Sequence, residues 1–176
     1  MSTARWVGSS LPYATAAGGA RDDWAEEARR LGGRGTQQLG EVSEVAAPSD
    51  VIEVLGADQV VVRRRVMLLD DRPVELTDSY YPVEIARGTA LAEPRKIRGG
   101  AVRLLAELGH RPRLIREDVY AHRPTARERD ALRLDDQGWT LRIFRVSSTE
   151  TGLPVEVSVM TMPAESRRLR YEINVE

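Results

Sequence analysis

Hydrophobic and polar residues alternate with a period of two along several segments of this 176-residue chain. That alternation is typical of strands with one buried face. The clearest case is a pair of apolar segments, 58–70 and 73–81, separated by a short polar turn that predicts a β-hairpin. Further strands are predicted at 36–46, 112–122, 139–147, 153–162 and 169–175. Because hairpins join several of these strands, we expect an antiparallel sheet.

Other segments carry apolar residues at the three-to-four-residue spacing of amphipathic helices. These predicted helices cover residues 21–31, 48–55, 101–108 and 125–134. At the start of the last one, Thr125 followed by Glu128 fits a capping box. Residues 1–20 show no sustained period and are expected to be a linker or N-terminal arm, which leaves one domain over residues 21–176. The mixture predicts an α+β fold, an antiparallel sheet flanked by helices.

Composition narrows the functional classes. The chain has no cysteine, which excludes disulfides, thiolate metal sites and a cysteine nucleophile. Its net charge of −1 is not that of a chain that holds DNA by itself. No apolar run approaches the roughly 20 residues that span a bilayer, and the N-terminus lacks the apolar stretch of a signal peptide. We therefore expect a cytoplasmic protein with no membrane contact.

Three consecutive arginines stand inside the otherwise apolar strand 58–70. Strand parity places Arg63 and Arg65 on one face and Arg64 on the other. A buried guanidinium without a partner is costly, so the first pair points to a pocket for an anion or a polar ligand. A structural network is the alternative, with Arg63 and Arg65 paired to acidic residues of neighbouring strands: Glu75, Glu117 or Glu156. Arg64 is expected at the surface or in a dimer interface.

Parity in the neighbouring strands adds polar groups to the face of Arg63 and Arg65. One face of the sheet is expected to be apolar and covered by helices, with Leu153, Val155, Val157 and Val159 contributing to it. The opposite, mixed face fits a ligand site. Its candidate ligand-binding residues are Arg63, Arg65, Thr77, Ser79, Glu156 and Ser158. Glu156 has an alternative role as the partner of Arg145.

The remaining candidates carry weaker signals. Tyr171 is a further candidate ligand contact, or else a core aromatic residue with a satisfied hydroxyl. The arginines at 167, 168 and 170 are expected to be solvated, with an interface to a DNA-binding domain as the alternative. His110 and His122 lack metal-ligand spacing, so neither a metal nor a cofactor is expected. No recognisable catalytic motif is present, and we do not predict an enzyme.

The order of motifs resembles that of the UTRA domain, the effector-sensing half of GntR-type bacterial transcriptional regulators of the histidine-utilisation repressor subgroup. The resemblance covers about residues 21–176. It is carried by Arg63-Arg64-Arg65, Asp71-Arg72-Pro73-Val74, Ser79-Tyr80-Tyr81-Pro82, Leu104-Leu105-Ala106-Glu107-Leu108-Gly109, Arg123-Pro124-Thr125, Thr151-Gly152-Leu153-Pro154-Val155-Glu156 and Arg170-Tyr171-Glu172.

The resemblance implies a sheet like that of chorismate lyase, a small-molecule pocket on that sheet, and a homodimer. Ligand contacts are then expected at the positions of Arg63, Arg65, Thr77 and Glu156. It also implies an upstream winged helix-turn-helix that binds DNA. Only about 20 residues precede the similar region, so DNA contact is expected only through a domain absent from this chain. Asp71 stands where the family usually has glycine, and a longer or differently shaped loop is expected there.

These observations favour an effector-binding and dimerisation domain of a transcriptional regulator, with a small polar or anionic metabolite as its ligand. One alternative is a stand-alone UTRA module that associates with full-length regulators and modulates them. A small lyase that acts on a carboxylate substrate is the second alternative, because an arginine pair suits such a substrate.

Overall fold

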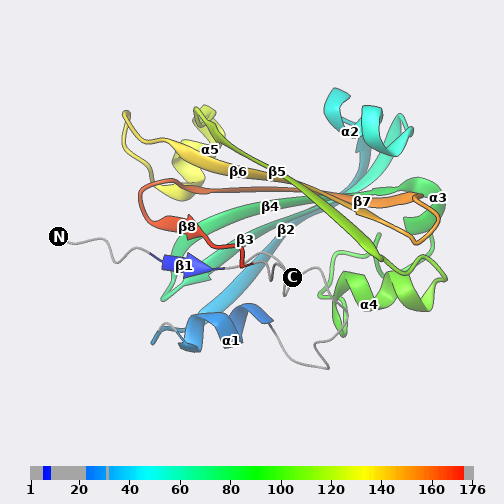
Figure 1. The fold of residues 1–176 in the computed structure, drawn as a ribbon, viewed down its shortest axis with the longest axis horizontal. Coiled ribbons are helices and arrows are strands. Elements are labelled where there is room, and N and C mark those ends of the chain that lie inside the picture. The colour runs from blue at the N-terminus through cyan, green and yellow to red at the C-terminus, as the bar shows by residue number, and fades with distance from the viewer. Residues whose placement is uncertain (1–5, 9–22, 31, 173–176) are drawn as a thin grey trace.

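A computed structural model describes residues 6–8, 23–30 and 32–172 (Figure 1). The elements in chain order are β1 (Trp6–Gly8), α1 (Asp23–Arg30), β2 (Gly35–Ala46), α2 (Ser49–Leu55), β3 (Gln59–Leu69), β4 (Arg72–Pro82), α3 (Val83–Ala86), α4 (Gly100–Glu107), β5 (Leu114–His122), α5 (Ala126–Leu132), β6 (Thr140–Ser148), β7 (Pro154–Pro163) and β8 (Arg167–Leu169).

Six of these strands form one antiparallel sheet in the order β2-β3-β4-β7-β6-β5. Both predicted hairpins, β3–β4 and β6–β7, lie in its middle and on its β5 side. Helices cover both faces: α2 and α5 lie above the sheet in Figure 1, and α1 and α4 lie below it. The predicted α+β class with an antiparallel sheet and flanking helices is confirmed.

The ends of the chain differ from the prediction. Within the segment expected to be an arm, β1 pairs in parallel with β8 and forms a second, two-stranded sheet. The last predicted strand, 169–175, is wrong in its bounds, because β8 ends at Leu169 and residues 170–172 are not a strand; 173–175 lie outside the described residues. Strands of three residues are too short to show a period, and their pairing is a long-range contact.

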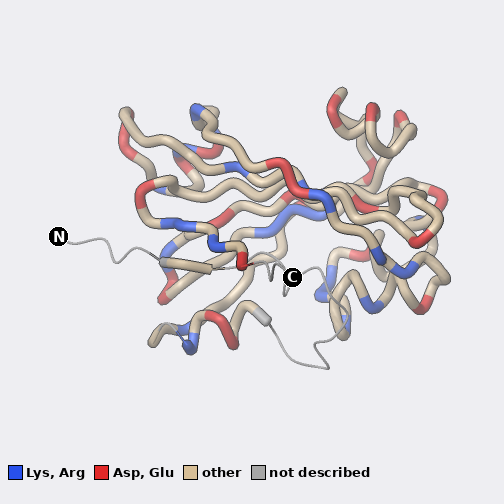
Figure 2. The backbone as a smooth tube through the Cα atoms, in the orientation of Figure 1, with Lys and Arg blue, Asp and Glu red and all other residues tan. Residues whose placement is uncertain are grey.

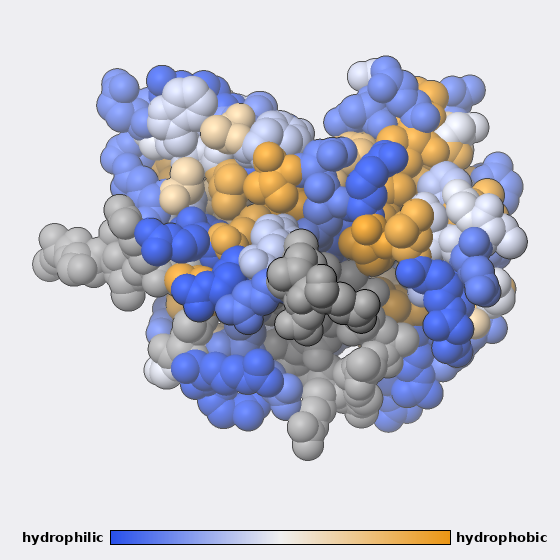
Figure 3. Space-filling model, in the orientation of Figure 1, coloured by the Kyte–Doolittle hydropathy of each residue, from blue (hydrophilic) through white to orange (hydrophobic). Residues whose placement is uncertain are grey.

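The two faces of the sheet are named here by the arginines of β3. The lower face carries Arg63 and Arg65 and packs against α1 and α4, through clusters around Trp24 and Leu105. The upper face carries Arg64 and packs against α2 through a cluster around Val51. Acidic and basic positions are interspersed along the strands (Figure 2). The space-filling view is hollowed at its top, between the parts that carry α5 and α2 (Figure 3).

The expectation of one fully apolar face is wrong, and a β-bulge explains part of the error. The register between β6 and β7 shifts beside Ser148. As a result Val155 packs into the lower cluster with Val61, whereas Val157 packs into the upper cluster. Leu153 precedes β7 and is exposed. An extra residue in a strand reverses the parity of what precedes it, and parity counting from sequence does not detect it.

The turn between β3 and β4 is tight, so the expected longer loop at Asp71 is wrong. Asp70 and Asp71 both adopt a left-handed backbone, with φ of 49° and 63°. Leu69 pairs directly with Arg72, leaving a two-residue turn. Aspartate tolerates this conformation better than most residues. Arg34 supports both: its backbone N–H donates to Asp70 Oδ1 at 2.8 Å, and its guanidinium donates to Asp71 at 3.0 Å.

Candidate functional site

A row of polar side chains crosses the lower face from one strand to the next. Arg63 is registered opposite Ser79, Ser79 opposite Ser158, Ser158 opposite Arg145, and Arg145 opposite Glu117. Directly opposed residues of antiparallel strands point to the same side of a sheet. These five residues are called the polar ladder below. It runs from β3 to the edge strand β5, between apolar clusters at the α1 and α4 ends of the face.

Arg63 holds the loop between α3 and α4. Its side chain is buried, at 4% exposure, and its guanidinium donates four hydrogen bonds at 2.7 to 3.3 Å. The acceptors are the backbone carbonyls of Ala90, Leu91, Glu93 and Arg95. Burial lowers the pKa of the Arg63 guanidinium from its ordinary value. The predicted ligand contact is therefore already engaged by the protein's own backbone, and it fixes a loop that borders the lower face.

Arg65 is less completely engaged. Its Nη2 donates to Ser79 Oγ at 2.8 Å, while its buried Nε has no hydrogen-bond partner among the described residues. Within that part of the chain, no carboxylate lies within ion-pair distance of Arg65. A half-buried guanidinium with a hydroxyl as its neighbour is a strong donor for an incoming anion.

Hydroxyl groups connect Arg65 to a buried carboxylate. Ser79 Oγ lies 2.8 Å from Ser158 Oγ, which donates to Glu156 Oε1 at 2.9 Å. The Tyr81 hydroxyl donates to the same oxygen at 2.8 Å. Burial raises the pKa of Tyr81 far above its usual range, so its hydroxyl remains a neutral donor. The structure thus brings Arg65, Ser79, Ser158 and Glu156 together in one continuous network.

Thr77 points to a second carboxylate on the same face. Its hydroxyl donates to Glu75 Oε1 at 2.8 Å. Burial raises the pKa of Glu75, and the charges of Arg167, Arg145 and Arg65 oppose that shift. Arg167 is buried, with Nη1 3.7 Å from Glu27 Oε1, so the expectation that it is solvated is wrong. The exposed Arg168 and Arg170 fit that expectation.

Glu117 and Tyr171 close the ladder at the edge of the sheet. Glu117 Oε1 accepts from Arg145 Nε at 2.7 Å, and both side chains are 7% exposed. Glu117 Oε2 accepts from the hydroxyl of Tyr171 at 2.8 Å. Tyr171 is 44% exposed, so it is not a core aromatic residue. Arg145 therefore pairs with Glu117, while the carboxylate of Glu156 accepts from hydroxyls.

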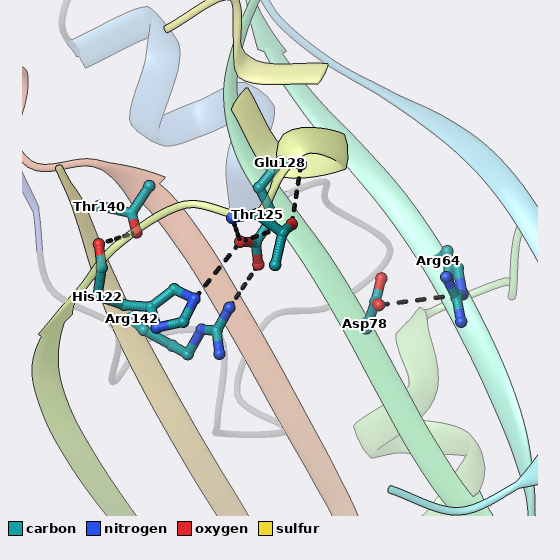
Figure 4. Close-up of polar contacts among 7 residues, drawn as sticks. All are labelled: Arg64, Asp78, His122, Thr125, Glu128, Thr140 and Arg142. Carbon is teal, nitrogen blue, oxygen red and sulfur yellow. Dashed lines mark hydrogen bonds and ion pairs between the residues drawn. The ribbon is translucent and has the colours of Figure 1, made fainter. Parts of the chain in front are cut away.

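A separate charged cluster lies on the upper face, under α5 (Figure 4). Thr125 and Glu128 form the predicted capping box, and Glu128 also pairs with Arg142 from β6 and lies 3.5 Å from His122 Nε2. Burial alone would raise the pKa of Glu128, but the Thr125 backbone N–H and Arg142 outweigh it and lower that pKa. All the acidic and basic groups of this cluster answer one another.

Arg64 belongs to the same upper face. It lies between the carboxylates of Glu41 and Asp78, with N···O distances of 3.2 and 3.9 Å. Burial raises the pKa of Asp78, and the charge of Arg64 opposes the shift. In Figure 4, Arg64 and Asp78 point toward each other across adjacent strands. Arg64 is thus half-buried in an ion pair rather than fully at the surface.

Sequence reasoning placed all of its candidates on the lower face except Tyr171, which lies at the end of the ladder. It missed Arg145 and Glu117 as members, although their parity in predicted strands was a usable signal. The described residues contain no group of histidine and acidic side chains arranged to hold a metal. In the same part of the chain, no helix is long and apolar enough to cross a membrane.

The chain belongs to the UTRA domain family, whose family model matches residues 30–168. It is 30% identical over 132 residues to "Uncharacterized HTH-type transcriptional regulator SCO4628" of Streptomyces coelicolor. That match covers 72% of this chain and 49% of the regulator. The chain therefore spans about half the length of the curated relative that it matches.

Solved structures show the same fold at lower identity. PhnF from Mycobacterium smegmatis is 18% identical, with a TM-score of 0.74 over 89% of this chain and 70% of PhnF. The C-terminal domain of the histidine utilization repressor from Pseudomonas syringae pv. tomato is 21% identical, with a TM-score of 0.65 over 81% of this chain and 100% of that domain. The predicted resemblance to UTRA domains of GntR-type regulators is confirmed.

Proposed function

We propose that this domain binds a small metabolite with an anionic group on its lower face and thereby controls a GntR-type transcriptional regulator. The carrying observation is Arg65, whose guanidinium meets one hydroxyl and whose Nε has no partner among the described residues. A carboxylate or a phosphate monoester would supply the missing acceptors. DNA contact is assigned to a separate helix-turn-helix domain, of the kind that the name of the Streptomyces coelicolor relative states.

The neighbours of Arg65 define a second requirement for the ligand. Glu156 accepts from Tyr81 and Ser158, and a carboxylate has room for about four hydrogen bonds. A ligand hydroxyl or amine is therefore recognised at the Glu156 end while its anionic group lies at Arg65. Met160 is registered opposite Thr77 and packs with Ile143, which provides an apolar surface beside the charge. The favoured ligand is small, polar and doubly functional.

Ligand binding is coupled to the loop between α3 and α4. Arg63 lies two residues from Arg65 on the same face and holds that loop by four carbonyls. A ligand that binds one arrangement of the loop more tightly than another shifts the population toward it. Through residues 83–100, this shift changes how two protomers and their DNA-binding domains are spaced.

A thermal-shift screen tests the proposal. The panel contains phosphate monoesters and small carboxylic acids, each measured with the parent chain, with Arg65→Ala and with Arg64→Ala. We expect compounds that raise the melting temperature of the parent and of Arg64→Ala but not of Arg65→Ala. A panel compound that stabilises Arg65→Ala as much as the parent would place the site elsewhere.

A further inference from the structure

The two edges of the six-stranded sheet differ in how they are protected. The β2 edge is interrupted by a register shift between Leu39 and Val42, and its start is held by α1, where Trp24 Nε1 donates to the Thr36 carbonyl at 3.0 Å. β5 pairs with β6 over nine consecutive residues without a shift. Its other edge pairs with no strand in the described part of the chain. Bulges and covering helices are the usual protection of an edge, and β5 has neither.

The side chains of β5 are unusually exposed for an apolar strand. Leu114 is 60% exposed, Val119 42% and Tyr120 40%. The strand contains no lysine or proline, the residues that most often prevent pairing at an edge. On the front of the molecule, along which β5 runs in Figure 1, apolar patches flank a charged band (Figure 3). Arg116 and Asp118 in this strand are exposed and have no ion-pair partner among the described residues.

We propose that β5 pairs antiparallel with β5 of a second copy of this chain, around a two-fold axis at Glu117. In that register Leu114 of one protomer lies opposite Tyr120 of its partner. Likewise Ile115 lies opposite Val119, and Arg116 lies opposite Asp118. Each contact occurs twice because the interface is isologous. The exposed apolar residues and the unpaired charges of the strand all meet complementary groups, and the two sheets become one continuous sheet.

Neighbouring registers lack this complementarity. An axis at Asp118 would place the two Asp118 carboxylates opposite each other and Arg116 opposite Tyr120. An axis at Val119 would place Asp118 opposite Tyr120 and Arg116 opposite His122. With the axis at Glu117, the two Glu117 side chains do meet, but each is already bonded to Arg145 and to the Tyr171 hydroxyl of its own chain.

This interface deepens the dimerisation part of the proposed function, and its regulatory consequence rests on that function. The polar ladder leads from the Arg65 neighbourhood through Ser158 and Arg145 to Glu117. A ligand that repositions Arg145 therefore acts on the residue at the two-fold axis. The self-association itself is measured without ligand, so its failure and the failure of effector binding are separate results.

Sedimentation velocity on charge-reversal variants tests the interface. We expect the parent chain to be a dimer. Arg116→Asp places two carboxylates opposite Asp118, and Asp118→Arg places two guanidinium groups opposite Arg116, so each variant should weaken the dimer about tenfold or more. An equimolar mixture of the two variants restores both opposite-charge contacts and should form a heterodimer. The double variant Arg116→Asp/Asp118→Arg should form a homodimer again.

Gln38→Asp is the matched control, because it adds a charge at an exposed position of the other edge strand, β2. It should leave the dimer intact. Circular dichroism confirms that each variant is folded, which the exposure of both charged positions favours. A monomeric parent, or single reversals that dimerise like the parent, would overturn the interface. Folded variants that fail to associate on mixing would overturn the register at Glu117.

Discussion

The two faces of the sheet treat neighbouring arginines of one strand in different ways. On the upper face, Arg64 lies between two carboxylates, Glu41 and Asp78. On the lower face, Arg63 is bound by four backbone carbonyls, and Arg65 by a single hydroxyl. The upper face thus neutralises its charge locally, whereas the lower face uses one arginine to hold a loop and leaves the other available. The difference locates the ligand site more sharply than the shared motif does.

The largest predicted effect concerns Arg63. Arg63→Ala removes the donor to four carbonyls of the loop at residues 90–95 and should lower the free energy of unfolding by about 3 kcal/mol or more, because buried acceptors lose their partner. Arg64→Ala is the matched change on the upper face and should cost about 1 kcal/mol or less. Urea denaturation measures both. Equal losses at the two positions would remove the distinction between the faces.

A smaller effect is expected for the carboxylate under α5. The lowered pKa of Glu128 means that its charged form stabilises the fold at neutral pH, and this contribution is lost as pH falls through the folded pKa. Glu128→Gln keeps an acceptor for the capping box but removes the charge beside Arg142. It should cost about 1 kcal/mol at neutral pH. The deficit should shrink in acid, and a deficit that stays constant with pH would contradict the assignment.

The smallest effect has the opposite sign and belongs to the lower face. Burial raises the pKa of Glu75, so its charged form is disfavoured in the folded state, and this penalty is relieved as pH falls through the folded pKa. Glu75→Gln should therefore raise the free energy of unfolding at neutral pH, by up to about 1 kcal/mol. In acid the variant and the parent should converge. Thermal unfolding across a pH series checks this, and a loss of stability at neutral pH would show that Glu75 is needed as a charge.

The part of this account that sequence could predict follows from strand parity. Parity placed Arg63 and Arg65 together with Thr77, Ser79 and Ser158, because the period of a strand is independent of its partners. It did not predict the carbonyls bound to Arg63, which come from a loop about 30 residues along the chain. It also placed Val155 on the wrong face, since a bulge changes parity locally.

Charge partners were the least predictable feature. The Arg145–Glu117 pair joins β6 to β5, and it depends on the register between two strands that α5 separates in the chain. Arg167 was expected in solvent because it stands in a run of charges, but the two-stranded sheet of β1 and β8 buries it. In both cases a long-range pairing decides which side chain a charge meets, and local composition carries no information on that pairing.

Calorimetric titration tests most directly whether Arg65 is the charge kept for the effector. The titrant is the panel compound that gives the largest thermal shift with the parent chain, and the proteins are the parent, Arg65→Ala and Arg64→Ala. Loss of a charge-assisted hydrogen bond predicts at least about tenfold weaker binding for Arg65→Ala. Arg64→Ala should bind within about twofold of the parent, because Arg64 faces the opposite side of the sheet. Parent-like affinity of Arg65→Ala, or an equal loss in Arg64→Ala, would contradict a ligand site on the lower face.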